Sequence, residues 1–223
     1  MKKTKKLLSL LVITVLALSS FCFSSVSFAE VDPIGYWTWF IPGGMVIDQT
    51  GNSIGAHTGN SAYDYFALTG SNYAYIWNTS YINVGTGDFS IACSFRTSST
   101  KYNNTILDKR TSADRGYHLT LIDGRPCLQM CTSSSNLFNY YSSSTPSYND
   151  GLWHNLIVSV DRNSTTGLKF YVDGSLILTM NPTGVSGDLT NTVDLYIGKH
   201  RDYSANNFVG DLDEIKLYNA ALY

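Results

Sequence analysis

Glutamate, proline and long apolar stretches are all scarce in this sequence. Only two of its 223 residues are glutamates and five are prolines. Beyond residue 30 no segment repeats apolar side chains at the spacing of a helix, which excludes a helical bundle and a parallel sheet with helical crossovers. What remains is a chain rich in tyrosine, serine, threonine and asparagine, as is typical of extracellular β proteins.

The main apolar run lies at the start of the chain. Four lysines fall within the first six residues, residues 7–18 are almost entirely apolar, and Ser27-Phe28-Ala29 places small residues where a signal peptidase reads them. This pattern predicts a signal peptide over residues 1–29 and a secreted or surface-associated domain over residues 30–223. An uncleaved anchor is the alternative. The run is shorter than the ~20 residues of a spanning helix, so we expect no stable membrane insertion.

Removal of this segment would leave an acidic chain. Eleven basic side chains would face seventeen acidic ones, without a stripe of lysine or arginine. Nucleic acid and anionic membranes are therefore not expected partners, because clusters of basic residues recognise both.

Three cysteines lie beyond the predicted signal. Cys127 and Cys131 are four residues apart in one predicted strand, or about 13 Å at ~3.3 Å per residue, which is too far for a disulfide. Cys93 could pair with either if the strands are neighbours. We favour the alternative of three buried free thiols. No second Cys/His pair has the spacing of zinc ligands.

Short alternating runs of Val, Ile, Tyr, Phe and Thr are separated by clusters of Gly, Asn, Asp and Ser. They predict antiparallel strands, with tight hairpins at Asp123-Gly124 and Asp173-Gly174 and another hairpin around residues 69–72. Trp153 is expected in the core and His154 is expected to be a hydrogen-bonded structural imidazole. Regular turns between about a dozen strands indicate an all-β, two-sheet antiparallel sandwich of the jelly-roll type. The predicted strands are residues 34–40, 62–68, 73–76, 89–96, 104–109, 117–122, 126–131, 137–141, 153–161, 168–172, 175–180, 193–198 and 212–219.

Six short strings carry a more specific signal. In chain order they are Ile34-Gly35-Tyr36-Trp37, Asp48-Gln49-Thr50-Gly51-Asn52, Gly87-Asp88-Phe89-Ser90-Ile91, Asp150-Gly151-Leu152-Trp153-His154, Phe170-Tyr171-Val172-Asp173-Gly174, and residues 210–222. They resemble, in this order, the laminin G-like jelly-roll domains of the concanavalin A-like lectin/glucanase superfamily. The resemblance covers residues 34–222.

The resemblance implies a structural Ca²⁺ between an early turn and the last strand. Asp48 and Asn52 from the turn, with Asp213 from the strand, would supply the oxygen ligands that Ca²⁺ prefers. The alternative is an Asx-turn at residues 48–52 and an Asp213 that is satisfied by the protein.

We do not expect catalysis. Glycoside hydrolases of this fold use two glutamates ~5–5.5 Å apart, but the sequence offers only Glu30, at the predicted mature terminus, and Glu214. Asp211 and Asp213 would share a strand face, yet they belong to the string that resembles the family's last structural strand. Serine-hydrolase elbows, phosphate-binding loops and zinc-protease motifs are also absent.

Three polar segments that contain or flank aromatic residues are candidate binding surfaces. Arg110 and Arg115 precede Tyr117, and Tyr141 belongs to another segment. A solvated loop without a ligand is the alternative for each. The richest segment is the loop at residues 199–207, with His200, Arg201, Asp202, Tyr203, Asn206 and Asn207.

These observations predict a secreted, lectin-like module that binds a glycan or polysaccharide and has no catalytic activity. A protein-binding adhesion or structural module, with a surface protein as partner, is the alternative that the resemblance also implies. A polysaccharide-active enzyme is the least favoured interpretation.

Overall fold

The computed structural model describes residues 31–38, 44–59, 65–112, 114–133 and 136–223. Apart from the short 3₁₀ turns η1 (Ser80–Ile82) and η2 (Ser204–Asn206), the regular structure of these residues is β-strand. No helix in this part of the chain is long and apolar enough to cross a membrane. The strands are β1 (Gly35–Thr38), β2 (Met45–Asp48), β3 (Ile54–His57), β4 (Phe66–Thr69), β5 (Ala74–Ile76), β6 (Phe89–Arg96), β7 (Asn103–Arg110), β8 (Gly116–Ile122), β9 (Arg125–Cys131), β10 (Leu137–Tyr140), β11 (Trp153–Val160), β12 (Leu168–Val172), β13 (Ser175–Met180), β14 (Leu195–Ile197) and β15 (Val209–Tyr218).

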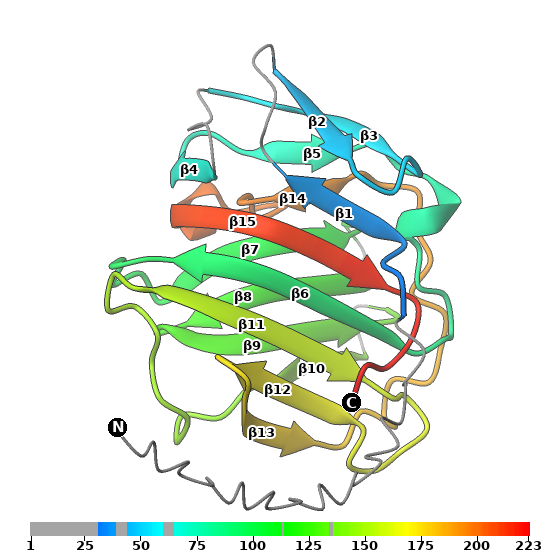
Figure 1. The fold of residues 1–223 in the computed structure, drawn as a ribbon. Coiled ribbons are helices and arrows are strands. Elements are labelled where there is room, and N and C mark those ends of the chain that lie inside the picture. The colour runs from blue at the N-terminus through cyan, green and yellow to red at the C-terminus, as the bar shows by residue number, and fades with distance from the viewer. Residues whose placement is uncertain (1–30, 39–43, 60–64, 113, 134–135) are drawn as a thin grey trace, which may run out of the picture. The chain divides into compact units, whose positions relative to one another are not determined.

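The described strands form one antiparallel sheet that folds back on itself. Its order is β10-β9-β8-β7-β14-β5-β3-β2-β1-β15-β6-β11-β12-β13, and β4 pairs with β15 beside this path. In Figure 1, β15, β6 and β11 cross in front of β7, β8 and β9. The all-β antiparallel prediction is confirmed. The division into two sheets is not confirmed, because hydrogen bonds join all these strands along a single path.

Alternation of side chains places the core between the front and back strands. Leu156, Val158 and Val160 point inward from β11, as their spacing predicts. The ring of Phe89 on β6 contacts that of Tyr117 on β8, with centroids 5.7 Å apart, so side chains of both layers meet. Burying each such large apolar side chain contributes roughly 1.5–3 kcal/mol relative to exposure.

Two hairpins have the predicted turn geometry. Asp123 and Gly124 have φ of 49° and 76°, and Asp173 and Gly174 have φ of 51° and 76°. Positive φ at both central residues is the type I′ geometry that matches the twist of paired strands. These turns connect β8 to β9 and β12 to β13.

Other local predictions are wrong. β4 and β5 do not form a hairpin around residues 69–72, because β4 pairs with β15 whereas β5 pairs with β3 and β14. The predicted strands also omit β2 and β3, which are four residues each. Trp153 is not in the core: it is 39% exposed, since it alternates outward on β11.

The predictions for cysteine and for His154 agree with the structure. Cys93, Cys127 and Cys131 are free and buried. His154 Nδ1 lies 2.8 Å from Asp173 Oδ2, and its Nε2 lies 3.1 Å from Asp150 Oδ1. This imidazole therefore ties two loops to β11.

The β12–β13 turn provides a test of the register. Gly174→Ala should lower the free energy of unfolding by about 1 kcal/mol, because alanine disfavours positive φ while no atom lies within 4 Å of the added Cβ. Gly174→Asn should cost less, because asparagine tolerates this region. Urea denaturation measures both variants, and equal stability of Gly174→Ala and wild type would contradict a type I′ turn.

Candidate binding surface

A stripe of aromatic side chains runs along β5 on the face opposite the core. Ala74 and Ile76 are fully buried, so Tyr73, Tyr75 and Trp77 alternate to the other side of the strand. The ring centroids of Tyr73 and Tyr75 lie 6.4 Å apart, as do those of Tyr75 and Trp77. We call Tyr73, Tyr75, Trp77 and the adjacent Tyr196 the aromatic stripe.

The neighbouring strands keep this stripe accessible. Tyr75 lies between Tyr196 on β14 and Ala56 on β3 in the sheet register, and Ala56 is too small to cover it. Trp77 is 40% exposed. Further along the same face, β3 and β2 expose aliphatic side chains: Ile54, Ile47 and Met45 are each at least 39% exposed.

The connection between β14 and β15 borders the stripe. Lys199 Nζ lies 4.2 Å from the ring centroid of Tyr73 and 4.5 Å from that of Tyr196. The rest of the loop is held against β7. Asp108 Oδ2 accepts a hydrogen bond from the backbone N–H of Arg201, and Asn207 forms an isolated bridge with Thr105.

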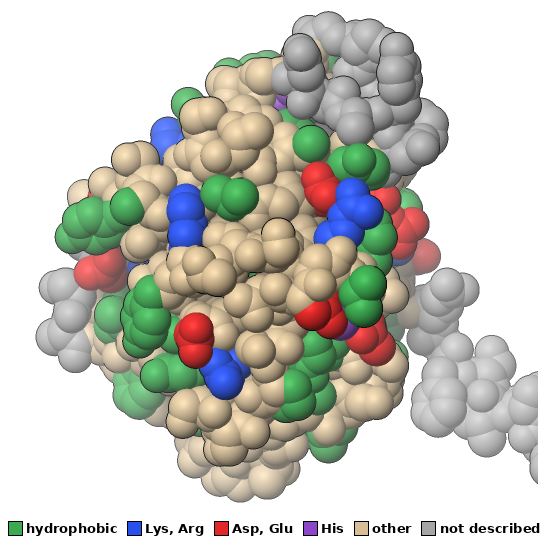
Figure 2. All heavy atoms as spheres, turned by 90° about the vertical axis from the view of Figure 1, so that its left-hand side faces the viewer, with side chains coloured by type: hydrophobic (Ala, Val, Ile, Leu, Met, Phe, Trp, Pro, Cys, Tyr) green, Lys and Arg blue, Asp and Glu red, His purple; other side chains and the backbone are tan. Residues whose placement is uncertain are grey.

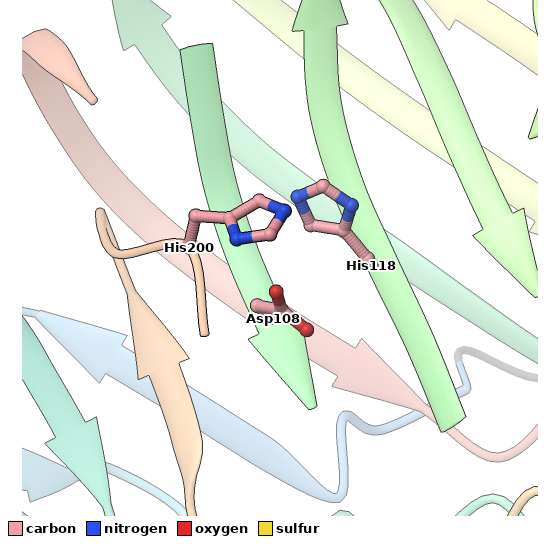
Figure 3. Close-up of side chains that lie close together, drawn as sticks. All are labelled: Asp108, His118 and His200. Carbon is pink, nitrogen blue, oxygen red and sulfur yellow. The ribbon is translucent and has the colours of Figure 1, made fainter. Parts of the chain in front are cut away.

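Beneath this loop lies a buried polar network. Arg110 Nε and Nη2 donate to the two carboxylate oxygens of Asp108 at 2.8 and 2.7 Å. Arg110 Nη1 donates to Gln129 Oε1, which also accepts from His118 Nδ1 at 2.7 Å. Figure 3 shows His118 from β8 and His200 from the loop close to each other above the Asp108 carboxylate.

Hydrogen bonds define the tautomers of both histidines. His200 Nδ1 accepts from the backbone N–H groups of Asp202 and Tyr203, each at 3.1 Å, so the neutral ring carries its proton on Nε2. The 3.3 Å approach of Arg110 Nη2 to Nε2 is then a contact between two donors and not a hydrogen bond. His118 donates from Nδ1, which leaves Nε2 to accept from the Thr105 hydroxyl at 3.1 Å. His200 thereby closes the turn that presents Asp202 and Tyr203.

This cluster does not fit a metal ion, although its ligand atoms are close. One atom from each of Asp108, His118 and His200 lies within 4.8 Å of the others. The Arg110 guanidinium already pairs with both Asp108 oxygens and lies 3.3 Å from His200 Nε2. A metal would have to displace a buried, paired arginine, which costs several kcal/mol.

Burial and the charge of Arg110 set the pKa values of the groups in this network. Burial lowers the pKa of His118 to about 3, and burial also lowers the pKa of His200 below its usual value. Burial by itself raises the pKa of Asp108, but the hydrogen bonds and charge of Arg110, the neighbouring His118 and the Arg201 N–H together outweigh it and hold that pKa below the usual range. At neutral pH the network therefore holds neutral imidazoles around one ion pair.

The structure brings several of the predicted binding residues together. Arg110, His200 and Arg201 meet in or beside the network, and Arg201 also pairs with Asp114. Asp202 and Tyr203 stand at the exposed edge of the loop, where Tyr203 is 65% exposed.

The buried members of this group hold the loop in place and are not exposed ligand contacts. Asn207 is 4% exposed; its Nδ2 donates to the Gly70 carbonyl and its Oδ1 accepts from the His200 N–H. Arg110 is the last residue of β7 and is buried, not part of an open loop. Asn206 donates its N–H to the Tyr203 carbonyl within the turn.

Arg115 and Tyr141 lie outside this group. Arg115 is exposed and donates to the Thr132 carbonyl beside a hollow of about 420 Å³. Tyr141 lies near Tyr102, at the other end of β7. The three predicted segments therefore do not form one site.

The residues expected to bind calcium are arranged differently from a calcium site. Asp48 accepts four hydrogen bonds from protein donors: the backbone N–H groups of Tyr36 and Thr50 and the hydroxyls of Thr50 and Ser53. Asn52 directs its amide nitrogen, not its oxygen, toward the Ile34 carbonyl. This is the Asx-turn alternative, and it does not fit Ca²⁺ because the Asp48 oxygens are taken. Asp213 also has a partner within the protein.

Sequence reasoning missed the aromatic stripe, although a signal was present. Tyr73, Tyr75 and Trp77 alternate across a predicted strand, which places them on one face. The addition of Tyr196 and Lys199 could not be foreseen, because the pairing of β14 with β5 joins segments 120 residues apart.

Charge on the molecule is sparse and mixed. Figure 2 shows acidic and basic side chains in small groups of both signs, with wide polar areas between them, on the side that it presents. Arg96 and Asp211 form an ion pair at 2.7 Å, and the guanidinium lies over the Tyr65 and Trp153 rings. Among the described residues, the side shown has no large cluster of basic side chains of the kind that binds nucleic acid.

The described strands form an all-β domain with an exposed aromatic stripe on one face. A model of the laminin G-like type, described as the concanavalin A-like lectin/glucanases superfamily, matches residues 68–223. The chain belongs to this family. No curated protein matches it in sequence.

Solved structures with a similar fold include binding domains of a mosquitocidal protein and of botulinum neurotoxins. The binding domain of Paraclostridial Mosquitocidal Protein 1 superposes with a TM-score of 0.67 at 14% identity, over 86% of this chain and 50% of that one. The binding domain of Botulinum neurotoxin DC in complex with SialylT gives 0.64 at 13% identity, over 86% and 48%. The same domain in complex with rat synaptotagmin II gives 0.62 at 14% identity, over 84% and 48%. This chain therefore spans about half the length of these structures, and the likeness shows the fold alone.

The buried histidines predict a loss of stability in acid. The unfolded chain binds a proton at His118 and His200 below pH 6.5, whereas the folded chain binds it only at lower pH. Unfolding therefore takes up protons, and the free energy of unfolding should fall from pH 6.5 toward 4.5, by up to about 1.4 kcal/mol per pH unit for each such histidine. Urea titrations across pH 4.5–7.5 measure this slope.

Two variants separate the contributions of individual histidines to this pH dependence. His118→Gln should flatten the slope, because it removes one of the protons taken up. Burial alone lowers the pKa of His154, but Asp173 and Asp150 raise it above its usual value. Its stabilisation is thus complete below pH 6.5 and lost as pH rises through the folded pKa. His154→Gln should therefore lower stability in acid by a constant amount, leave the slope below pH 6.5 unchanged, and remove the fall in stability that His154 causes above pH 6.5. A slope below pH 6.5 that His118→Gln leaves unchanged, or that His154→Gln alters, would contradict these protonation states.

Proposed function

We propose that this chain is an exported, non-catalytic module that binds a glycan on the outer face of β5 and β14. The observation that carries the proposal is the aromatic stripe of Tyr73, Tyr75, Trp77 and Tyr196. Its side chains are partly exposed and fixed by the sheet: three are spaced along β5, and Tyr196 lies beside them on β14. Sugars have apolar faces that lie on such rings, and a few fixed polar groups then orient their hydroxyls.

The bordering loop supplies those polar groups. Asp202 and Tyr203 are exposed at the edge of the loop, and the neutral His200 ring fixes their backbone. A preformed site of this kind loses little conformational entropy when a ligand binds. Export is supported by the sequence pattern of residues 1–29, which lie outside the described residues.

The contacts that the acidic side chains make within the protein support a role without catalysis. Glu214, on the bulge of β15, accepts from the Tyr36 hydroxyl at 3.2 Å and pairs with Lys216 at 3.3 Å. Asp211 pairs with Arg96. The two-glutamate arrangement of glycoside hydrolases needs a second glutamate, and Glu30 is the only other one in the sequence.

An array of immobilised oligosaccharides tests the proposal. Tyr75→Ala and Trp77→Ala should each weaken binding by roughly 30-fold, because truncation of an aromatic anchor costs about 2 kcal/mol. Tyr171→Ala, on β12, is the matched control and should bind like wild type. Absence of binding to any glycan, or binding that both stripe variants retain, would overturn the proposal.

Protein binding is a second candidate function, favoured by the exposed aliphatic patch of Met45, Ile47 and Ile54 beside the stripe. Exposed apolar residues on adjacent strands are typical of protein contacts. If this patch binds protein, a second copy of the chain is the first partner to test. Sedimentation at rising concentration should show self-association that Ile54→Lys abolishes, while glycan binding persists. A wild-type chain that stays monomeric would count against this candidate.

A further inference from the structure

Lys199 is the cation closest to the aromatic stripe. Its ammonium lies over the rings of both Tyr73 and Tyr196, whose centroids are 6.0 Å apart. Contacts with two aromatic faces hold the ammonium in place, since each attracts a cation. The side chain is half-buried at the edge of the stripe, so water reaches it only in part.

In the described part of the chain, the neighbouring arginines are paired with carboxylates, whereas Lys199 is not. Arg110 pairs with Asp108, and Arg201 pairs with Asp114 and Asp202. Within the described residues no carboxylate lies within 4.0 Å of Lys199 Nζ. An aromatic face attracts the charge of an ammonium but accepts its N–H groups only weakly, so Lys199 retains donors for an external acceptor.

The stripe leads away from this ammonium in one direction. Tyr73 is nearest to Lys199, and Tyr75 and Trp77 follow along the strand at 6.4 Å steps. A linear glycan that lies along the strand can therefore stack successive sugar rings and still bring one substituent to Lys199. The substituent that matches a lone ammonium is a carboxylate.

We infer that the glycan bound by this surface is acidic, with a sugar carboxylate paired to Lys199 Nζ and neighbouring sugar rings on Tyr75 and Trp77. This inference rests on the proposed function and names the class of its ligand. A half-buried pair of this kind is less screened by salt than an exposed one, and it discriminates against neutral sugars, which leave the ammonium unpaired.

Matched ligands make the test specific. Oligomers of galacturonic acid, of alginate, of hyaluronan and of sialic acid are each compared with their carboxyl-reduced forms, which keep the same linkages and ring faces. At least one acidic oligomer should bind the whole chain about tenfold or more tightly than its reduced form by isothermal titration calorimetry. Its dissociation constant should rise as salt is added.

Variants then assign this preference to one residue. Lys199→Gln should weaken binding of the acidic oligomer about tenfold and leave the reduced form unchanged. Lys199→Arg should retain most of the preference because it keeps the charge. Lys169→Gln, on β12, removes the same charge elsewhere and should behave like wild type.

The outcomes separate this inference from the proposed function. Equal binding of acidic and reduced forms, or an acidic preference that survives Lys199→Gln, overturns the inference while glycan binding stands. Binding of no oligomer in either form, on these probes and on the array, overturns the proposed function and the inference with it.

Discussion

The two-residue alternation of side chains along each strand constrains every other feature of this protein. On β5 it sends Ala74 and Ile76 into the core and leaves Tyr73, Tyr75 and Trp77 on the opposite face. A shift of the pairing by one residue would exchange these two sets. Stability and the candidate site thus depend on the same register, because the residues that bury the strand also orient the aromatic stripe.

On β7 the same alternation places charged side chains on both faces of the strand, and all of them are buried. Lys109 points inward and donates to Asn78, Asn191 and the Val193 carbonyl, and burial lowers its pKa to about 8. Asp108 and Arg110 point outward beneath the loop and neutralise each other. Each of these three buried charges is therefore satisfied, which is the condition for burying it without a large cost.

The loop between β14 and β15 couples this network to the surface. Its turn is closed by a neutral His200, whose Nδ1 accepts two backbone N–H groups, and its lower side is fixed by Asp108. Protonation of Nδ1 would remove both acceptor contacts and place a cation beside Arg110. The exposed edge at Asp202 and Tyr203 is consequently ordered by groups that do not touch a ligand, as a preformed binding surface requires.

The sequence by itself determined the local structure: the all-β class, most strand positions, the type I′ turns at Asp123-Gly124 and Asp173-Gly174, and the order of strings that marks the family. These features depend on alternation and on turn chemistry, which act over a few residues. Tertiary structure alone decided which strands pair, that β4 joins β15, and that Trp153 faces outward. It also decided that Lys199 meets Tyr73, and that Arg110 and His200 belong to one buried network. Such contacts join residues far apart in the chain, and the free energy that selects them comes from burial in the whole fold and not from any local segment.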